Sequence, residues 1–375
     1  MSSRATRALR IAATVVFLAF GAFCVVLLAV RFVVLPQIEA RRGEIAQYLS
    51  ARLGQPVEVD ALVTGWNGWN PQISVRGFRI RAQPPREGLI LDLPRVDLLI
   101  AWTSLPLLDL RLKELMIDGP RLSVRRDASG RLHVGDIERD ADASANDAAF
   151  GDWLMRQPQI VIRDALVAWN DEYRRAPQLL LDHVTFRLEQ RFGRHQAGLT
   201  GVPPAELAAP LEIRADLTGH ALNDWTNLEG KLYFRVDYAD IAAWREWVSL
   251  PVPIDSGRGA VRAWIDFQKS QPFQITVDVE LEEVRATLGD GLAPLTIAHL
   301  DGRGAWKHTA SRNEFAAKQA SFTLVNGEAQ PPVDVALFIV PPRENQPGTG
   351  KATWTELDLR AIAALAPHVP LITTL

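Results

Sequence analysis

The sequence contains a single cysteine, Cys24, so no intramolecular disulfide can form and packing alone must hold the fold. The histidines are scattered without the spacing of metal ligands, at positions 133, 183, 195, 220, 299, 308 and 368. Two Gly-Arg-Gly-Ala tetrapeptides fail as dinucleotide fingerprints, because Arg262 and Lys307 stand where a third glycine is needed. We therefore expect no enzyme, no metal site and no cofactor.

The sequence also has no large excess of acidic or basic residues, since the formal net charge of the 375 residues is −3. Such a chain has no general attraction for nucleic acid. The acidic, low-complexity stretch within residues 138–156 faintly resembles a calcium loop. However, Ala145 replaces the glycine that the turn of such a loop requires, and Gly151 replaces its final glutamate. We interpret residues 138–156 as an exposed, flexible linker.

One long apolar run is present, from Ile11 to Val30, and it carries no charge. About 20 such residues in a helix cover the roughly 30 Å hydrocarbon core of a bilayer. A cleaved signal peptide has a shorter run and a small-x-small site, and a lipoprotein signal would not place Phe23 before Cys24. We predict an uncleaved helix over residues 11–35, anchored by Ile11, Val16, Phe20, Val25 and Val30.

The orientation of this helix follows from a weak charge bias. Arg4, Arg7 and Arg10 precede the run, whereas Arg31 and two further arginines follow it closely. A short basic tail inside and a large domain outside is the usual outcome, so residues 1–10 are expected in the cytoplasm. Residues 36–54 then show an apolar stripe and end at Gly54, which predicts a juxtamembrane amphipathic helix. It could lie on the membrane or pack against the first strands.

After residue 54 the hydrophobic period changes to two, which indicates strands. We expect one β segment over residues 55–137, with separate strands near Leu89–Leu93 and Val96–Trp102, and a second segment over residues 157–375. Several strands alternate strictly between apolar and charged residues, which gives an antiparallel sheet one dry and one wet face. The dry-face positions are predicted to be Leu211, Ile213, Leu217, Leu232, Phe234, Val236, Ile275, Val277, Val279 and Leu281.

Internal sequence repeats favour an elongated, repeated architecture over a closed globule. Residues 237–253 resemble residues 356–371, and each stretch pairs a strand end with a short helix. The chain stops soon after the second copy, which suggests the front portion of a longer protein. A dry sheet face must be covered, and two solutions fit the alternation. Two sheets could form a sandwich, or one sheet could curl into a groove that holds lipid acyl chains.

The order of these features resembles the bacterial AsmA-like superfamily, and most closely its YhdP branch. The resemblance is carried by the apolar run and by motifs in order, among them LPQIEARRGEIAQYLSARLGQPVEVDAL, TGWNGWNPQISVRGFRI, LKELMIDGPRLSVRRDASGRLHV and YADIAAWREWVSLPVPIDSGRGAVRAW. It implies a mostly β protein: a transmembrane helix followed by an elongated, curved antiparallel β-groove built of repeats, with a few short helices.

The resemblance also implies a function. Such a protein would be a single-pass inner-membrane protein with most of its chain in the periplasm, moving phospholipid toward the outer membrane and supporting the integrity of that membrane. Its expected partners are phospholipid, the inner membrane and other envelope proteins. No catalytic residues are implied. The alternative is a non-transporting envelope scaffold or outer-membrane assembly factor with a closed β core.

Overall fold

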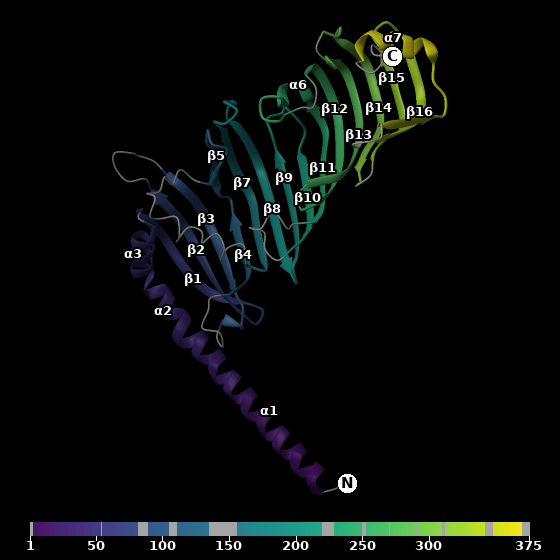
Figure 1. Cartoon of the computed structure of the whole chain (residues 1–375). Helices are drawn as coiled ribbons and strands as arrows, with labels where there is room; N and C mark the ends of the chain where they lie inside the picture. The colour runs from purple at the N-terminus through teal and green to yellow at the C-terminus, as the bar shows by residue number, and fades with distance from the viewer. Residues whose placement is uncertain are drawn as a thin grey trace. The chain divides into compact units, whose positions relative to one another are not determined.

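The structure is a computed structural model, and it describes residues 3–53, 55–81, 89–104, 111–134, 156–219, 229–249, 253–269, 271–289, 291–309, 312–341 and 348–369. The chain divides into two compact units, Met1–Pro120 and Arg121–Leu375. The fold class expected from the sequence is confirmed: the chain is mostly β, with one long apolar helix at its N-terminus and a few short helices (Figure 1). Most of the predicted linker, residues 138–156, lies outside the described residues.

The N-terminal helix is longer than the predicted span. α1 (Ser3–Ala29) continues through a π-helix (Val30–Val34) into α2 (Leu35–Ala40), and residues Arg10–Ala40 are long and apolar enough to cross a membrane. Pro36, in the first turn of α2, has no amide hydrogen to donate one turn back, and the π-helix lies where that bond would fall. The predicted helix over residues 36–54 is broken at Arg41, after which α3 (Arg42–Leu53) begins.

Both α2 and α3 are attached to the first strand of unit 1, β1 (Val57–Asn67). The Glu39 carboxylate of α2 accepts hydrogen bonds from the Thr64 amide at 2.6 Å and the Thr64 hydroxyl at 2.8 Å. In α3, the Ser50 hydroxyl oxygen accepts a bond from the Val57 amide at 2.9 Å. These bonds lie at both ends of β1, so they fix the helices along the strand.

Unit 1 contains an antiparallel meander of β1, β2 (Asn70–Arg81), β3 (Leu89–Ile100) and β4 (Leu112–Asp118). A two-residue turn joins β1 to β2, and Gly68 has the positive φ of 58° that such a turn needs. The prediction of two strands around Pro94 is wrong, because β3 runs through that residue. Pro94 lies between two regular pairs with β2, Arg95 with Arg76 and Leu93 with Phe78, so one missing amide hydrogen does not end the strand.

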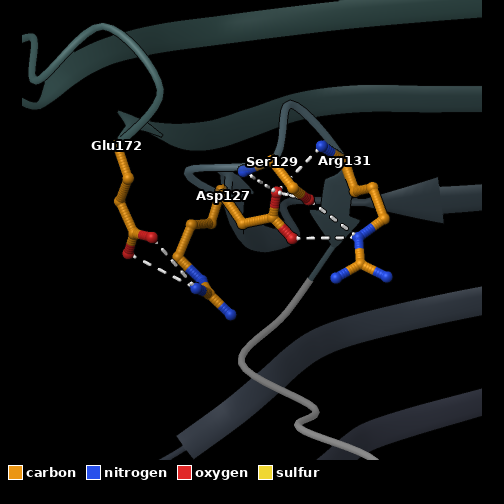
Figure 2. A network of polar contacts seen from close by, with 5 residues as sticks. Asp127, Ser129, Arg131 and Glu172 are labelled. Atoms are coloured by element: carbon orange, nitrogen blue, oxygen red, sulfur yellow. Dashed lines mark hydrogen bonds and ion pairs between the residues drawn. The ribbon is translucent and has the colours of Figure 1, made fainter.

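Unit 2 begins with the hairpin β5 (Arg121–Arg126) and β6 (Leu132–Val134). Figure 2 shows the predicted turn between these strands, at Asp127–Gly130. One Asp127 carboxylate oxygen accepts bonds from the Ser129 amide at 2.9 Å, the Ser129 hydroxyl at 2.6 Å and the Arg131 amide at 2.9 Å. The same figure includes Glu172, whose carboxylate accepts two bonds of 3.3 Å from Arg125. That contact ties β5 to the end of β7 (Gln159–Asp171), with which β5 pairs in parallel.

The remaining strands of unit 2 follow chain order in one curved sheet, and each is antiparallel to the next (Figure 1). They are β7 (Gln159–Asp171), β8 (Leu179–Arg191), β9 (Arg194–Val202), β10 (Leu211–Thr218), β11 (Glu229–Asp240), β12 (Ile254–Gln268), β13 (Gln271–Ala286), β14 (Leu295–His308), β15 (Asn313–Leu324), β16 (Ala329–Val340) and β17 (Thr349–Trp354). Short-range pairing of this kind needs only hairpin connections.

Two short helices cover one end of these strands. α6 (Ile241–Trp244) follows β11 and α7 (Leu359–Leu365) follows β17, each after an aspartate N-cap, so the repeat seen in the sequence is a structural repeat. Trp244 of α6 packs with the buried residues Val236 and Ala239. Leu365 of α7 packs against a buried cluster composed of Leu281, Val284, Leu295, Ile297 and Leu324. Both of these clusters of unit 2 therefore lie at the helix-covered margin of the sheet.

Candidate functional site

The strand register of unit 2 aligns apolar residues from every strand between β7 and β17. Directly paired residues in an antiparallel sheet project from the same face. We define row 1 as the successive partners Ile162, Phe186, Leu199, Ile213, Phe234, Ala263, Val277, Gly304, Ala317, Val335 and Trp354. We define row 2, two residues away on each strand, as Ile160, Leu188, Ala197, Ala215, Leu232, Ile265, Ile275, Trp306, Phe315, Leu337 and Ala352.

Rows 1 and 2 together form what we call the apolar band. It contains no charged or hydroxyl side chain on any of the eleven strands that it crosses. Neighbouring strands lie about 4.8 Å apart, so the ten intervals amount to roughly 48 Å measured across the strands. Two residues along a strand separate the rows by roughly 7 Å. The band is thus long, narrow and continuous.

Five of the ten residues predicted from the sequence lie in the band: Ile213, Phe234 and Val277 in row 1, and Leu232 and Ile275 in row 2. The other five lie on the same face beyond it. Leu211, Val236, Val279 and Leu281 continue toward the helix-covered margin, and Leu217 lies toward the opposite one. The ten predicted residues therefore share one face of the sheet, but they come from only three of its strands, β10, β11 and β13.

Side-chain exposure separates the band from its margin. At the margin, Leu211, Val236 and Leu281 are buried, and the last two pack in the clusters beside α6 and α7. In the band, the side chains of Phe234 and Val277 are half-buried and that of Trp354 is 56% exposed, whereas Ile160 and Leu188, at the β7–β8 end of row 2, are buried. A residue covered by a second layer would be as buried as the margin. From β9 to β17, no residue of the band is as buried as the margin.

Sequence reasoning missed the band residues of the other strands. The omitted residues with large side chains include Ile160, Ile162, Phe186, Leu188, Leu199, Ile265, Trp306, Phe315 and Leu337. A signal was present in β8, where apolar residues alternate with Arg187 in Phe186–Leu188, whereas Ile160–Ile162 and Phe315–Ala317 are continuous apolar runs that do not show which face is dry. What the sequence lacked was the register that joins these short patterns into rows.

The opposite face carries charged residues across β10 to β14. A cross-strand rung of Glu212, Arg235, Arg262, Asp278 and Arg303 runs beside the band on this face. Arg303 donates two bonds, of 2.5 and 2.7 Å, to the Asp278 carboxylate, and these bonds lower the pKa of that carboxyl below its ordinary value. A hydrogen bond from Arg235 likewise lowers the pKa of Asp237. One face of the sheet is therefore stabilised by water and ion pairs, and the other is not.

A basin of 590 Å³ lies on the charged face, and its lining also includes Ala197, Ala215 and Leu232 of row 2. Its polar lining comes from β8 to β13: Arg187, Glu189, Gln196, Arg214, Asp216, Lys231, Tyr233, Trp264, Asp266 and Gln274. Arg187 donates to Glu189 at 2.6 Å, and Lys231 lies 3.6 Å from Asp266, so charges of opposite sign pair within the lining. Acyl chains would have to desolvate these groups, which makes the basin an unfavourable site for them.

The predicted anchor residues lie on one apolar helix. Ile11, Val16, Phe20 and Val25 are 60 to 67% exposed on α1, whereas Val30, in the π-helix, is buried. An apolar helix with an exposed surface fits a hydrocarbon environment better than water. Among the residues that the structure describes, no group of three or more His, Cys, Asp and Glu side chains could hold a metal ion.

Comparisons with known proteins agree with the assignment that these features suggest. A search of curated proteins and a search of solved structures gave no match. A family model described as "YhdP protein" matches residues 1–375, the whole sequence given. The membrane-length helix, the strand-rich chain and this full-length match lead to one conclusion: the chain belongs to the YhdP family.

Proposed function

We propose that this protein is a lipid-transfer bridge segment of the bacterial cell envelope. α1 would cross the inner membrane, and the β units would lie in the periplasm. Phospholipid would move toward the outer membrane with its acyl chains on the apolar band, supporting outer-membrane integrity. The observation that carries the proposal is the band itself, because rows 1 and 2 are apolar over eleven consecutive strands and partly exposed from β9 to β17.

The dimensions of the band suit acyl chains. A bilayer core of about 30 Å contains two leaflets, so one tail spans roughly 15 Å and a band of roughly 48 Å accommodates about three tails end to end. Burying a methylene contributes about 0.8 kcal/mol, and a tail lying on a surface buries only part of each methylene. Contact with the band would therefore hold a lipid, while the free-energy barrier to each step along the band stays small.

The uniform polarity of the two rows also favours movement over storage. A storage site encloses its ligand in one pocket with a few polar groups that fix its orientation. The band instead offers the same kind of surface at each strand, from Ile162 on β7 to Trp354 on β17. A lipid headgroup could remain in water beside it throughout, so no strand would be a preferred stopping point.

Site-specific photocrosslinking tests this proposal. A photoreactive residue at Phe234 or Val277 of the full chain in cells should capture phospholipid, because both positions face the band. The matched control is Thr276, which precedes Val277 on β13 and projects from the charged face. A second control at Phe20 reports ordinary contact between α1 and membrane lipid.

The possible results separate the two functions considered. Capture at Phe234 and Val277 but not at Thr276 supports the bridge. Capture at Phe20 alone would refute it and would favour the scaffold with a closed β core, since a closed core would exclude lipid from both band positions.

A further inference from the structure

Three tryptophans lie at one end of the unit 1 sheet. Trp66 is the second-last residue of β1, Trp69 is in the β1–β2 turn, and Trp102 follows β3. The rings of Trp66 and Trp102 are 6.1 Å apart, and the side chain of Trp69 is 74% exposed. We call these three residues the tryptophan tip.

The tryptophan tip touches the apolar helix well before the helix ends. The ring of Phe23, in α1, lies 5.3 Å from the ring of Trp102. The guanidinium of Arg31 lies 5.9 Å from the centre of the Trp66 ring, a cation–π contact. The helix between residues 23 and 31 therefore runs alongside the tip, within unit 1.

These contacts set the depth of the tip if α1 spans a bilayer. Arg10 is the last charged residue before the apolar run, so the hydrocarbon core begins near Ile11. Phe23 lies twelve residues further on, or roughly 18 Å at 1.5 Å per residue. In a core of about 30 Å it is then roughly 12 Å short of the far boundary. Trp102, in contact with Phe23, lies at the depth of the far leaflet.

The backbone at the tip is adapted to an environment poor in water. The indole N–H of Trp102 donates to the Trp69 carbonyl oxygen at 2.9 Å, and the Asn70 side-chain amide donates to the Ile100 carbonyl oxygen at 2.9 Å. Two carbonyl groups at the end of the sheet thus have partners within the protein, as groups that enter lipid require. Tryptophan also favours the boundary between lipid and water, because its ring is apolar and its N–H is polar.

We propose that the tryptophan tip inserts into the membrane leaflet beside α1, with a lipid bilayer as its partner. The unit 1 sheet would then begin inside the leaflet, and a lipid could reach the strands without first leaving the membrane. The inference rests on the part of the proposed function that places α1 across the membrane. It does not rest on lipid transport.

The single cysteine makes a depth measurement direct. The full chain is reconstituted into phosphatidylcholine vesicles with an environment-sensitive fluorophore at one cysteine. Native Cys24 reports the span, and Asn67→Cys in a Cys24→Ser background reports the turn while keeping all three tryptophans. Arg76→Cys in the same background is the control, exposed on β2 and six residues from the turn. Nitroxide groups on the lipid acyl chains and aqueous iodide serve as quenchers.

We expect the acyl-chain nitroxides to quench the label at position 67 several-fold more strongly than the label at position 76, and iodide to show the reverse order. Trp69→Ser should weaken the lipid quenching at position 67, and because the Trp69 side chain is 74% exposed, its loss should leave the sheet folded. If the nitroxides quench the label at Cys24 but not the label at position 67, the insertion of the tryptophan tip is overturned while the membrane span of α1 stands. No lipid quenching of Cys24 would overturn the membrane span and the inference with it.

Discussion

Placing one carboxylate in the apolar band, by Val277→Asp, should remove lipid from the band without unfolding the sheet. Val277 is half-buried, and its cross-strand partners in row 1 are Ala263 and Gly304. Because both partners are small, the carboxylate can reach water when no lipid is bound. The cost to folding should then stay near the roughly 1 kcal/mol span of β-propensity.

The cost to lipid occupancy is larger. A charged residue against hydrocarbon costs about 2.5–3.5 kcal/mol on insertion scales. At 1.4 kcal/mol per tenfold change, occupancy at this point of the band should fall on the order of 100-fold. Lipid capture by a photocrosslinker at Phe234, the row 1 residue two strands away, measures this loss.

Two controls keep this prediction refutable. Thr276→Asp adds the same charge on the same strand but on the charged face, and Val277→Leu changes size but not polarity. Both should leave lipid capture close to that of the unaltered protein. Unchanged capture in Val277→Asp would refute the assignment of the band as the lipid path. Loss of folded protein in Val277→Asp, with both controls folded, would instead show that a second layer covers the band.

Three further predictions concern stability. Gly302→Ala should destabilise the sheet by about 1–3 kcal/mol, because Gly302 has φ 149° and an added Cβ would lie 2.7 Å from the Ala320 Cα. Gly304→Ala, in the same tetrapeptide, should not destabilise the sheet in this way. Denaturant midpoints of the two variants test the difference. Leu281→Ala should cost about 2–5 kcal/mol in the same assay, since this residue is only 7% exposed. Asp278→Asn should remove an acid-sensitive contribution. Because the pKa of Asp278 is lowered in the folded protein, its carboxylate stabilises the fold at pH values above the ordinary pKa of 3.8. This stabilisation is lost as the pH falls below that value. The difference in unfolding free energy between Asp278→Asn and the unaltered protein should therefore shrink at low pH.

The sequence predicted the apolar face of individual strands because alternation is local. β13 illustrates both the strength and the limit of that signal. Val277, Val279 and Leu281 alternate with polar residues, and then the phase slips so that Val284 is the next buried residue. Glu283, with a φ of 53°, is the extra residue of a bulge that resets the phase. The slip is visible in the sequence and could have been interpreted as a bulge.

One strand escaped prediction altogether. β9 (Arg194–Val202) contains two glycines and only one β-branched residue besides its final valine, so its strand propensity is weak. It forms because β8 and β10 flank it and pair with it along most of its length. Tertiary pairing therefore overrides local preference here, and no local pattern reveals it.

The tryptophan tip was beyond sequence reasoning for a different reason. Phe23 and Trp102 are separated by most of unit 1, and neither the apolar run nor the strand alternation relates their positions. Their contact depends on the length of α2, on the bond between Glu39 and Thr64, and on the register of β1 with β2. Such a contact results from several geometric choices at once, each of which the sequence leaves open.

The sizes of the band residues argue that the band faces a fluid and not a packed protein layer. Row 1 is uniform in polarity but not in volume, since Ala263 and Gly304 flank Val277 while Trp354 ends the row. Protein cores match volumes closely, and adding methylenes to them costs about 1–3 kcal/mol. Ala263→Leu should therefore cost less than about 0.5 kcal/mol, as a surface substitution does.

Ala239→Leu is the matched comparison, because Ala239 is 6% exposed and packs with Trp244 of α6. Overpacking at this margin should cost about 1–3 kcal/mol, measured by denaturant unfolding of both variants. If Ala263→Leu proved as destabilising as Ala239→Leu, the band would be a packed core, and the scaffold function would follow. A small cost at Ala263 and a large one at Ala239 would mean that this sheet leaves its dry face open at Ala263 and packs the margin beneath its two helices.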